Sequence, residues 1–307
     1  MQRTIRIGTR ESQLAVWQAS LVKELLEKNS FAAELVYIKS EGDIDLKTPL
    51  YEMGVQGIFT KSLDIALLQE KIDIAVHSMK DVPTQPARGI RQTAVLKRAS
   101  FKDLLVYKQD LSFLDGSESQ AIIATSSIRR KAQWLHRYPQ HRIENLRGNV
   151  NTRLKKLEES IWNGAIFAAA GLERIDLRPE NSIELDWMLP APAQGAIIVV
   201  CRDEDVYSFD ACQPFNDKDT ALCTKIERDF LRALYGGCST PISALAVIDD
   251  NQVRFKGNIL SPDGKQIVEI EKTFSREDAS NAGKKSGEEI LEMGGKEITR
   301  SFQDAAT

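Results

Sequence analysis

Cys238 is the residue of this chain that most clearly offers a reactive side chain. It follows Gly236 and Gly237, which come after a segment, 221–234, whose apolar spacing predicts a helix. Glycines end helices readily, and Pro241 prevents the chain from resuming one. The sequence therefore predicts a thiol presented on a tight turn. A small buried cysteine in a loop is the alternative, and the turn alone favours that alternative. The arginines and one aspartate elsewhere in the chain reverse this preference.

Arginine is concentrated in one stretch of the chain. Residues 125–178 hold 11 Lys and Arg against five Asp and Glu, although the whole chain has a net charge of −3. The clearest pattern is 125–130, where a predicted strand ends, three hydroxyl residues begin a helix, and two arginines follow. Helix N-termini and guanidinium groups both attract anions. The pattern therefore indicates a carboxylate or phosphate site.

The same arrangement recurs elsewhere. Arg10 and Ser12 follow the first predicted strand, and Arg147 and Arg153 flank another strand-to-helix junction. The carboxyl ends of strands are where open α/β sheets bind ligands. A single arginine is more often part of a solvated surface. Recurrence at such junctions in two regions favours anion recognition.

Lys80 and Asp81 form a second candidate site, after a predicted buried strand at 72–76 and before Pro83. An aspartate that faces arginines stays ionised, and it can stabilise a cation or move a proton. A capping or salt-bridged aspartate is an equal alternative at this point. Lys80 could also form a Schiff base, but the neighbouring carboxylate favours its charged and unreactive form.

Length and composition indicate a globular protein. A chain of 307 residues predicts two or three domains. Its charge gives no reason to expect nucleic acid or a membrane surface as a partner. No apolar run is long enough for a transmembrane helix, and no signal-peptide pattern begins the chain, so we expect a cytoplasmic protein. Neither the four cysteines nor the three histidines show metal-ligand spacing, so no metal site is predicted.

Apolar spacing predicts two α/β regions and a C-terminal α+β region. The first region has predicted strands at 5–7, 35–37 and 72–76 and helices at 9–28 and 59–69. The second has predicted strands at 121–124, 143–146 and 165–170 and helices at 127–138 and 151–162. The third has a helix at 221–234, strands at 242–248, 253–260 and 266–274, and a helix at 278–293. A strand at 197–201 has no sheet assigned by its pattern.

The motifs together resemble the porphobilinogen deaminase (hydroxymethylbilane synthase) family. They occur in the family's order and extend from residue 7 to residue 242. The matching segments are 7–15, 77–83, 125–130, 146–154, 169–172 and 236–242. The resemblance implies two α/β domains like those of periplasmic binding proteins, and a C-terminal α+β domain with a small antiparallel sheet. It implies domain limits of 1–97 with 191–212, 98–190, and 213–307, so that 197–201 returns to the first sheet.

The resemblance also implies an activity and a cofactor. A cytoplasmic monomer would deaminate four porphobilinogen molecules and join them into hydroxymethylbilane, using a dipyrromethane held covalently by Cys238. Asp81 would be catalytic and would stabilise the cation left by loss of ammonia. The cofactor would also contact Lys80, Asp81, Ser126, Arg129 and Arg130. The substrate would contact Arg10, Ser12, Thr125, Ser127, Arg147, Arg153 and Arg174. A non-catalytic anion-binding protein of the periplasmic-receptor type is the alternative.

The chain departs from the family pattern in three places. The family's Gly-Gly-Lys-Gly reads Gly-Val-Gln-Gly at 54–57, so a basic contact from this loop is in doubt. A common Lys-Glu-Leu reads Lys-Ser-Leu at 61–63. The usual Pro-Ala-Val-Gly-Gln-Gly-Ala reads Pro-Ala-Pro-Ala-Gln-Gly-Ala at 190–196, and the extra proline is expected to stiffen this return.

Overall fold

The computed structural model describes residues 3–39, 60–116, 119–237 and 240–304. The chain divides into two compact units. Of the described residues, the first comprises 3–39, 60–99 and 195–222, and the second comprises 100–116, 119–194, 223–237 and 240–304. The division into three domains therefore stays a prediction, with the second and third predicted domains in one unit.

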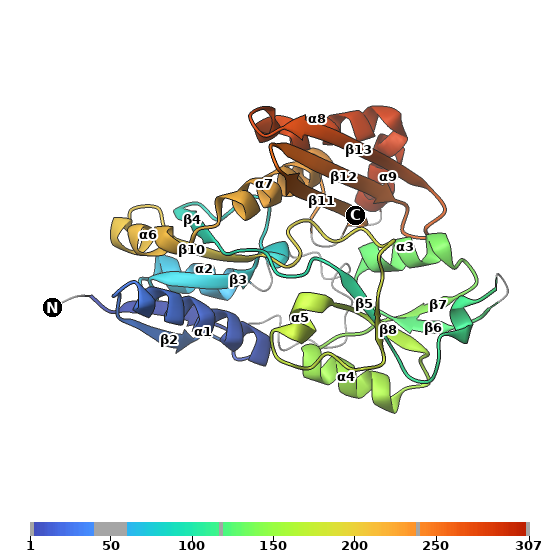
Figure 1. Cartoon of the computed structure of the whole chain (residues 1–307), viewed down its shortest axis with the longest axis horizontal. Helices are drawn as coiled ribbons and strands as arrows, with labels where there is room; N and C mark the ends of the chain where they lie inside the picture. Colours follow the sequence, from blue (N-terminus) through green and yellow to red (C-terminus); the bar gives the residue numbers. More distant parts are fainter. Residues whose placement is uncertain (1–2, 40–59, 117–118, 238–239, 305–307) are drawn as a thin grey trace. The chain divides into compact units, whose positions relative to one another are not determined.

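The first unit is built on a five-stranded sheet in the order β2-β1-β3-β10-β4 (Figure 1). Its strands are β1 (Ile5–Thr9), β2 (Ala33–Tyr37), β3 (Ile74–Ser78), β4 (Ile90–Val95) and β10 (Ile197–Arg202). β1 pairs in parallel with β2 and β3, whereas β10 lies antiparallel between β3 and β4. The late strand therefore completes the first sheet, as the resemblance implied.

Helices cover both faces of this sheet. On one face α1 (Gln13–Lys28) and α6 (Val206–Cys212) pack their apolar side chains against alternate residues of β1, β3 and β10. On the other face α2 (Lys61–Leu68) packs so closely that a Cβ at Gly8 would lie 3.0 Å from Leu63. Strand alternation thus provides two buried faces, as expected for a sheet between helix layers.

The second unit repeats this plan in a sheet of order β7-β6-β8-β5-β9. Its strands are β5 (Asp103–Tyr107), β6 (Ile122–Ala124), β7 (Arg142–Glu144), β8 (Gly164–Ala168) and β9 (Ser182–Glu184). β6 is parallel to β7 and β8, and β5 runs antiparallel to β8. α3 (Ile128–Arg137) packs on one face, and α4 (Val150–Glu159) with α5 (Ala169–Glu173) packs on the other.

The C-terminal part of the second unit is a three-stranded antiparallel sheet with helices (Figure 1). Its elements are α7 (Lys218–Ala233), β11 (Ile242–Asp249), β12 (Gln252–Leu260), β13 (Ile267–Ser275), α8 (Ala282–Ile290) and α9 (Lys296–Asp304). A Cβ at Gly257 would lie 2.6 Å from the Phe230 ring, and one at Gly283 would lie 1.9 Å from the Ile226 carbonyl oxygen. Glycine is thus needed for α7 to approach both β12 and α8. The predicted fold class is confirmed.

Several boundaries differ from the predictions. The strands β4, β5 and β9 were not predicted, and the strand expected at 165–170 ends at Ala168, where α5 begins. The C-terminal helix was expected to run unbroken to 293. Instead α8 ends at Ile290 in a π-helical turn, and Gly294 takes a left-handed φ of 108° before α9 begins. Only glycine adopts this conformation without strain, so the helix turns there.

Candidate functional site

In the first unit the predicted residues gather at one edge of the sheet. β1 and β3 are parallel neighbours, so their carboxyl ends lie together. Arg10 and Ser12 follow β1, and Lys80 and Asp81 lie in a short 3-10 turn (Met79–Asp81) directly after β3. Ser12 is the N-cap of α1, yet its hydroxyl makes no capping hydrogen bond. The edge therefore offers a guanidinium, an ammonium, a carboxylate and a hydroxyl.

His77 lies behind this edge and is only 7% exposed. Burial, together with the positive charge of Arg10, lowers the pKa of His77 to about 3. Its Nε2 atom is buried and has no hydrogen-bond partner among the described residues. The imidazole is therefore neutral at physiological pH and adds no positive charge to that of Arg10.

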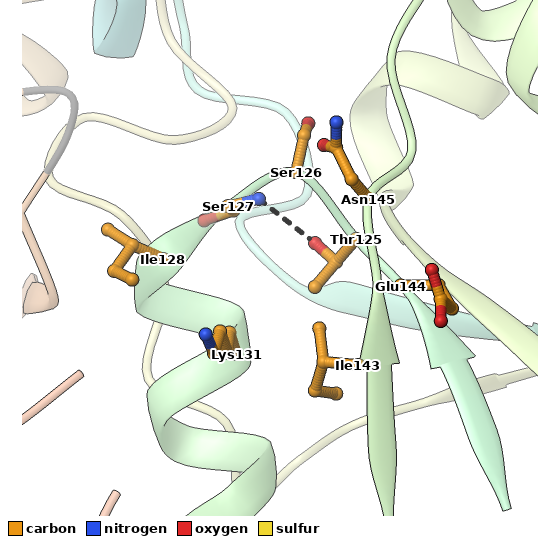
Figure 2. Close-up of a pocket in the computed structure, with 8 residues that line it drawn as sticks. All are labelled: Thr125, Ser126, Ser127, Ile128, Lys131, Ile143, Glu144 and Asn145. Carbon is orange, nitrogen blue, oxygen red and sulfur yellow. Dashed lines mark hydrogen bonds between the residues drawn. The ribbon is translucent and has the colours of Figure 1, made fainter. Parts of the chain in front are cut away.

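In the second unit the hydroxyl residues surround a cavity of about 200 Å³. Figure 2 shows Thr125, Ser126 and Ser127 between the end of β6 and the start of α3, with Asn145 on the segment that follows β7. The Ser127 N–H donates to Thr125 Oγ1 at 3.2 Å, and the Arg130 N–H donates to Ser127 Oγ at 3.4 Å. These bonds fix the first turn of α3, and Ser126 is among the residues that line the cavity.

Arg129 and Arg130 converge on Asp103, a buried aspartate at the start of β5. Arg130 Nη2 donates to Asp103 Oδ1 at 2.7 Å, and Arg130 Nη1 donates to the Ile166 carbonyl at 2.8 Å. Arg129 Nη2 forms an ion pair with Asp103 Oδ2 at 2.9 Å, and its Nη1 donates to the Leu189 carbonyl at 2.8 Å. Asp103 is fully buried, and the two arginines are 4% and 5% exposed.

This cluster holds one more positive charge than negative. Two guanidinium groups face one carboxylate, and burial lowers the pKa of Arg129 because its charge is removed from water. The buried Nε of Arg129 has no hydrogen-bond partner within the described chain. Buried donors and charges are costly unless they are paired. The donor set therefore suits a carboxylate-bearing group such as the implied dipyrromethane.

The other predicted arginines also follow strands of the second sheet. Arg147 comes after β7 and is 3% exposed, Arg153 lies in α4, and Arg174 ends α5. Burial lowers the pKa of Arg174 to about 10, and the charge of Glu173 opposes that shift. Since β6, β7 and β8 are parallel, the segments that follow them leave the same edge of the sheet. The segments that carry the predicted second-unit residues therefore all start from one edge of this sheet.

Cys238 lies outside the described residues, as does the 54–57 loop, but the chain on either side of Cys238 is defined. Tyr235 takes the left-handed conformation after α7, with a φ of 56°, whereas Gly236 and Gly237 do not. A Cβ at Gly236 would lie 2.5 Å from Ile242 Cδ1, so glycine is needed there for packing. Thr240 Oγ1 accepts the Gly237 N–H at 3.2 Å and donates to the Gly237 carbonyl at 2.8 Å. The two ends of the turn are therefore tied together.

Sequence reasoning missed two supporting residues. Asp103 forms ion pairs with the two buried arginines, and Gln194 donates a hydrogen bond to Asp103. Gln194 Nε2 donates to Asp103 Oδ1 at 3.0 Å and to the Phe101 carbonyl at 2.8 Å. The available signal was the apolar Leu104–Val106 run, which reads as a buried strand that begins with an aspartate. An acidic residue at a strand end near an arginine-rich region predicts an ion pair.

Comparison with known proteins assigns the family. Residues 5–209 match the family model "Porphobilinogen deaminase, dipyromethane cofactor binding domain", and residues 221–292 match "Porphobilinogen deaminase, C-terminal domain". The porphobilinogen deaminase of Campylobacter hominis is 36% identical over 98% of this chain and 99% of that protein. The one from Pelotomaculum thermopropionicum is 40% identical over 98% of this chain and 97% of that protein.

Two solved structures are similar to part of the chain. A probable amino-acid ABC transporter extracellular-binding protein from Bacillus subtilis is 13% identical, with a TM-score of 0.42, over 70% of this chain and 90% of that one. An ancestral cationic amino acid solute binding protein is 13% identical, with a TM-score of 0.44, over 69% of this chain and 87% of that one.

The arginine-bearing sheets and the matching cofactor domain define a transferase that carries a dipyrromethane. The chain belongs to the porphobilinogen deaminase family. The predicted activity is confirmed: the protein deaminates porphobilinogen and joins four molecules into hydroxymethylbilane in tetrapyrrole biosynthesis. Within the described residues, no helix is both long and apolar enough to cross a membrane.

Proposed function

We propose that the dipyrromethane is attached through a thioether to Cys238 and that arginines of both sheets bind the carboxylates of cofactor and substrate. The observation that carries this proposal is the buried excess of positive charge at Arg129 and Arg130. Each porphobilinogen unit has an acetate and a propionate arm, and guanidinium groups bind carboxylates well in dry surroundings. Ser126 and Lys80 would add a hydrogen bond and a charge to cofactor carboxylates.

Elongation requires further carboxylate contacts as the product lengthens. The substrate-binding residues that we propose are Arg10, Ser12, Thr125, Ser127, Arg147, Arg153 and Arg174. They are supported by their places after parallel strands in each unit. The buried members lose hydration, so a carboxylate pairs with them more strongly than with a surface arginine.

Asp81 is the proposed catalytic residue. When bound, the dipyrromethane supplies the pyrrole carbon from which the product chain grows. The Asp81 carboxylate accepts hydrogen bonds from pyrrole N–H groups and stabilises the positive charge that develops as ammonia leaves. Lys80 beside it keeps a compensating positive charge close by.

The remaining parts of the proposal concern the protein's surroundings. We propose that one cofactor is carried per chain and that the protein acts as a cytoplasmic monomer without nucleic acid or membrane partners. The net charge of −3 supports the absence of an anionic partner. The anion-binding alternative is not favoured, because the matches to the deaminase family extend over both units.

The test is an intact-mass measurement with a peptide map around Cys238. We expect an added mass of two linked porphobilinogen units on this peptide, lost in Cys238→Ser and kept in Cys223→Ser, a matched change at a buried cysteine. Asp81→Asn should keep the added mass and lose most turnover, because only the catalytic charge is removed. A cofactor-loaded Cys238→Ser protein would reject the tether, and near-normal turnover of Asp81→Asn would reject the catalytic role.

A further inference from the structure

A chain of buried polar contacts connects α7 with the Arg129–Arg130 pair. Glu227 of α7 accepts the Ala193 N–H at Oε2 at 2.6 Å and the Ala246 N–H at Oε1 at 2.8 Å. Gln194, the residue after Ala193, donates a hydrogen bond from its side-chain amide to Asp103 at 3.0 Å. All of these residues belong to the second compact unit. The contacts therefore run without a gap from the helix before Cys238 to the two arginines.

Burial makes the loss of any of these contacts costly. Glu227 is 0% exposed, Gln194 is 1% exposed, and Asp103 is 0% exposed. A buried polar group that loses its partner is not rescued by water, so each member has one favourable arrangement. Asp103 Oδ1 receives Gln194 Nε2 and two nitrogens of Arg130, while Oδ2 faces Arg129. The carboxylate thus cannot rotate without breaking contacts to all three side chains.

We propose that Gln194 is a positioning residue for carboxylate binding: it fixes the Asp103 carboxylate, which in turn orients Arg129 and Arg130. Glu227 holds the backbone that carries Gln194 and aligns it with α7. This inference rests on the proposed role of Arg129 in binding cofactor carboxylates. A cofactor held in the wrong position would present its pyrrole end poorly to the incoming porphobilinogen, and KM for porphobilinogen would rise. Its consequence is that the α7 end before the attachment turn and the carboxylate-binding arginines keep a fixed relation within one unit.

A matched control can distinguish an effect transmitted through Asp103 from a general loss of stability in the core. Gln133 is a second buried glutamine, 5% exposed, whose amide donates to the Leu189 carbonyl and to Ser243 Oγ. Arg129 also uses the Leu189 carbonyl. Gln133 therefore touches the surroundings of Arg129, whereas none of its hydrogen bonds reaches Asp103. Gln133→Met is the matched control for Gln194→Met, since both exchanges keep shape and charge.

The experiment measures KM and kcat for porphobilinogen on holoenzyme of the wild type and of the two methionine variants. The intact mass of each protein gives the fraction of chains that carry the cofactor, and kcat is expressed per loaded chain. We expect Gln194→Met to raise KM about tenfold with kcat changed less than about threefold, because binding is lost more than chemistry. It should also lower the loaded fraction. Gln133→Met should lower the melting temperature to a similar extent and leave KM within about twofold.

A double-mutant cycle with Arg129→Lys completes the test. If Gln194 acts through this arginine, Gln194→Met should raise KM much less in the Arg129→Lys background than in the wild type. Equal KM changes in the two methionine variants, or additive effects in the cycle, would overturn the positioning role. An unchanged KM in Arg129→Lys alone would reject the proposed role of Arg129 itself, and the inference with it. If KM rises in Arg129→Lys but stays unchanged in Gln194→Met, the positioning role of Gln194 is rejected and the proposed role of Arg129 stands.

Discussion

Two buried aspartates, Asp73 and Asp103, each gather arginines, but at opposite edges of their sheets. Asp73 precedes β3 at the amino edge of the first sheet, where its backbone N–H donates to the Arg6 carbonyl. Asp103 begins β5, which runs antiparallel to β8 and is paired there with Ala168, so it lies at the carboxyl edge. Strand direction alone therefore places one cluster beside the predicted ligand residues and the other away from them.

The two clusters differ in the exposure of their arginines rather than in their charge. The Asp73 cluster contains Asp73, Asp205, Arg3, Arg6 and Arg202. It has one more arginine than carboxylates, as the Asp103 cluster does. The side chains of Arg3 and Arg6 are 43% and 37% exposed, whereas those of Arg129 and Arg130 are 5% and 6% exposed. Water can satisfy the excess charge in the first case, whereas a carboxylate of the proposed ligand would satisfy it in the second.

The largest expected effect is the loss of the Asp103 charge. Asp103→Asn keeps the size of the side chain and leaves two buried guanidinium groups without a carboxylate. Such a change should lower the free energy of unfolding by about 3–5 kcal/mol. Urea unfolding of the holoenzyme measures it. A loss below about 1 kcal/mol would mean that water reaches these arginines, and the contrast with the Asp73 cluster would fail.

Asp73→Asn should cost less, about 1–3 kcal/mol, because Arg3 and Arg6 can turn toward solvent. Arg6 Nε and Nη2 each donate to Asp73 at 2.9 Å, and Arg3 forms an ion pair with it. Raising the salt concentration should reduce the loss of unfolding free energy caused by Asp73→Asn, because salt screens exposed charges. The loss caused by Asp103→Asn should change less, because its arginines are buried. Equal salt sensitivity in urea unfolding would contradict this ranking.

Acid should remove the stabilising effect of Asp73. Burial by itself would raise the pKa of this carboxyl, but hydrogen bonds from Arg6 and Arg3 lower the pKa well below its ordinary value. The unfolded chain therefore binds this proton first, and the contribution to stability is present at neutral pH and lost as the pH falls below about 4. The unfolding free energies of wild type and Asp73→Asn should begin to approach each other below about pH 5 and continue to do so as the pH falls toward the lowered pKa of Asp73. Parallel curves would show that the charge of Asp73 is not responsible.

The smallest expected effect concerns Ala193, beside Gln194. Ala193 has a φ of 62°, in the left-handed region where a Cβ is unfavourable, and the family's usual residue there is glycine. Ala193→Gly should raise the free energy of unfolding by about 1 kcal/mol. Ala191→Gly, at a position without a positive φ, should lower it by a similar amount. Thermal unfolding compares them, and destabilisation by both would show that Ala193 is not strained.

The sequence predicted the residues that directly follow strands better than those that support them. Arg10, Thr125 and Arg147 were correctly placed after strands, because a strand pattern, a turn and a helix start are local features. Asp103 was missed because its partners lie 26, 27 and 91 residues away. Tyr235 was not expected to take a left-handed φ, since two glycines follow it. In both cases packing between distant segments decides the outcome, and local propensity does not report it.

The position of β10 has a consequence for how the protein is made. β4 has β10 as its neighbour in the sheet, and β10 separates it from β3. A nascent chain that has been synthesised only through residue 190 therefore holds an open β3 edge and an unpaired β4. Open edges invite pairing with other chains, and contacts between distant segments form slowly. The first sheet can close only after synthesis has passed Arg202, when all strands of the second sheet have already been synthesised.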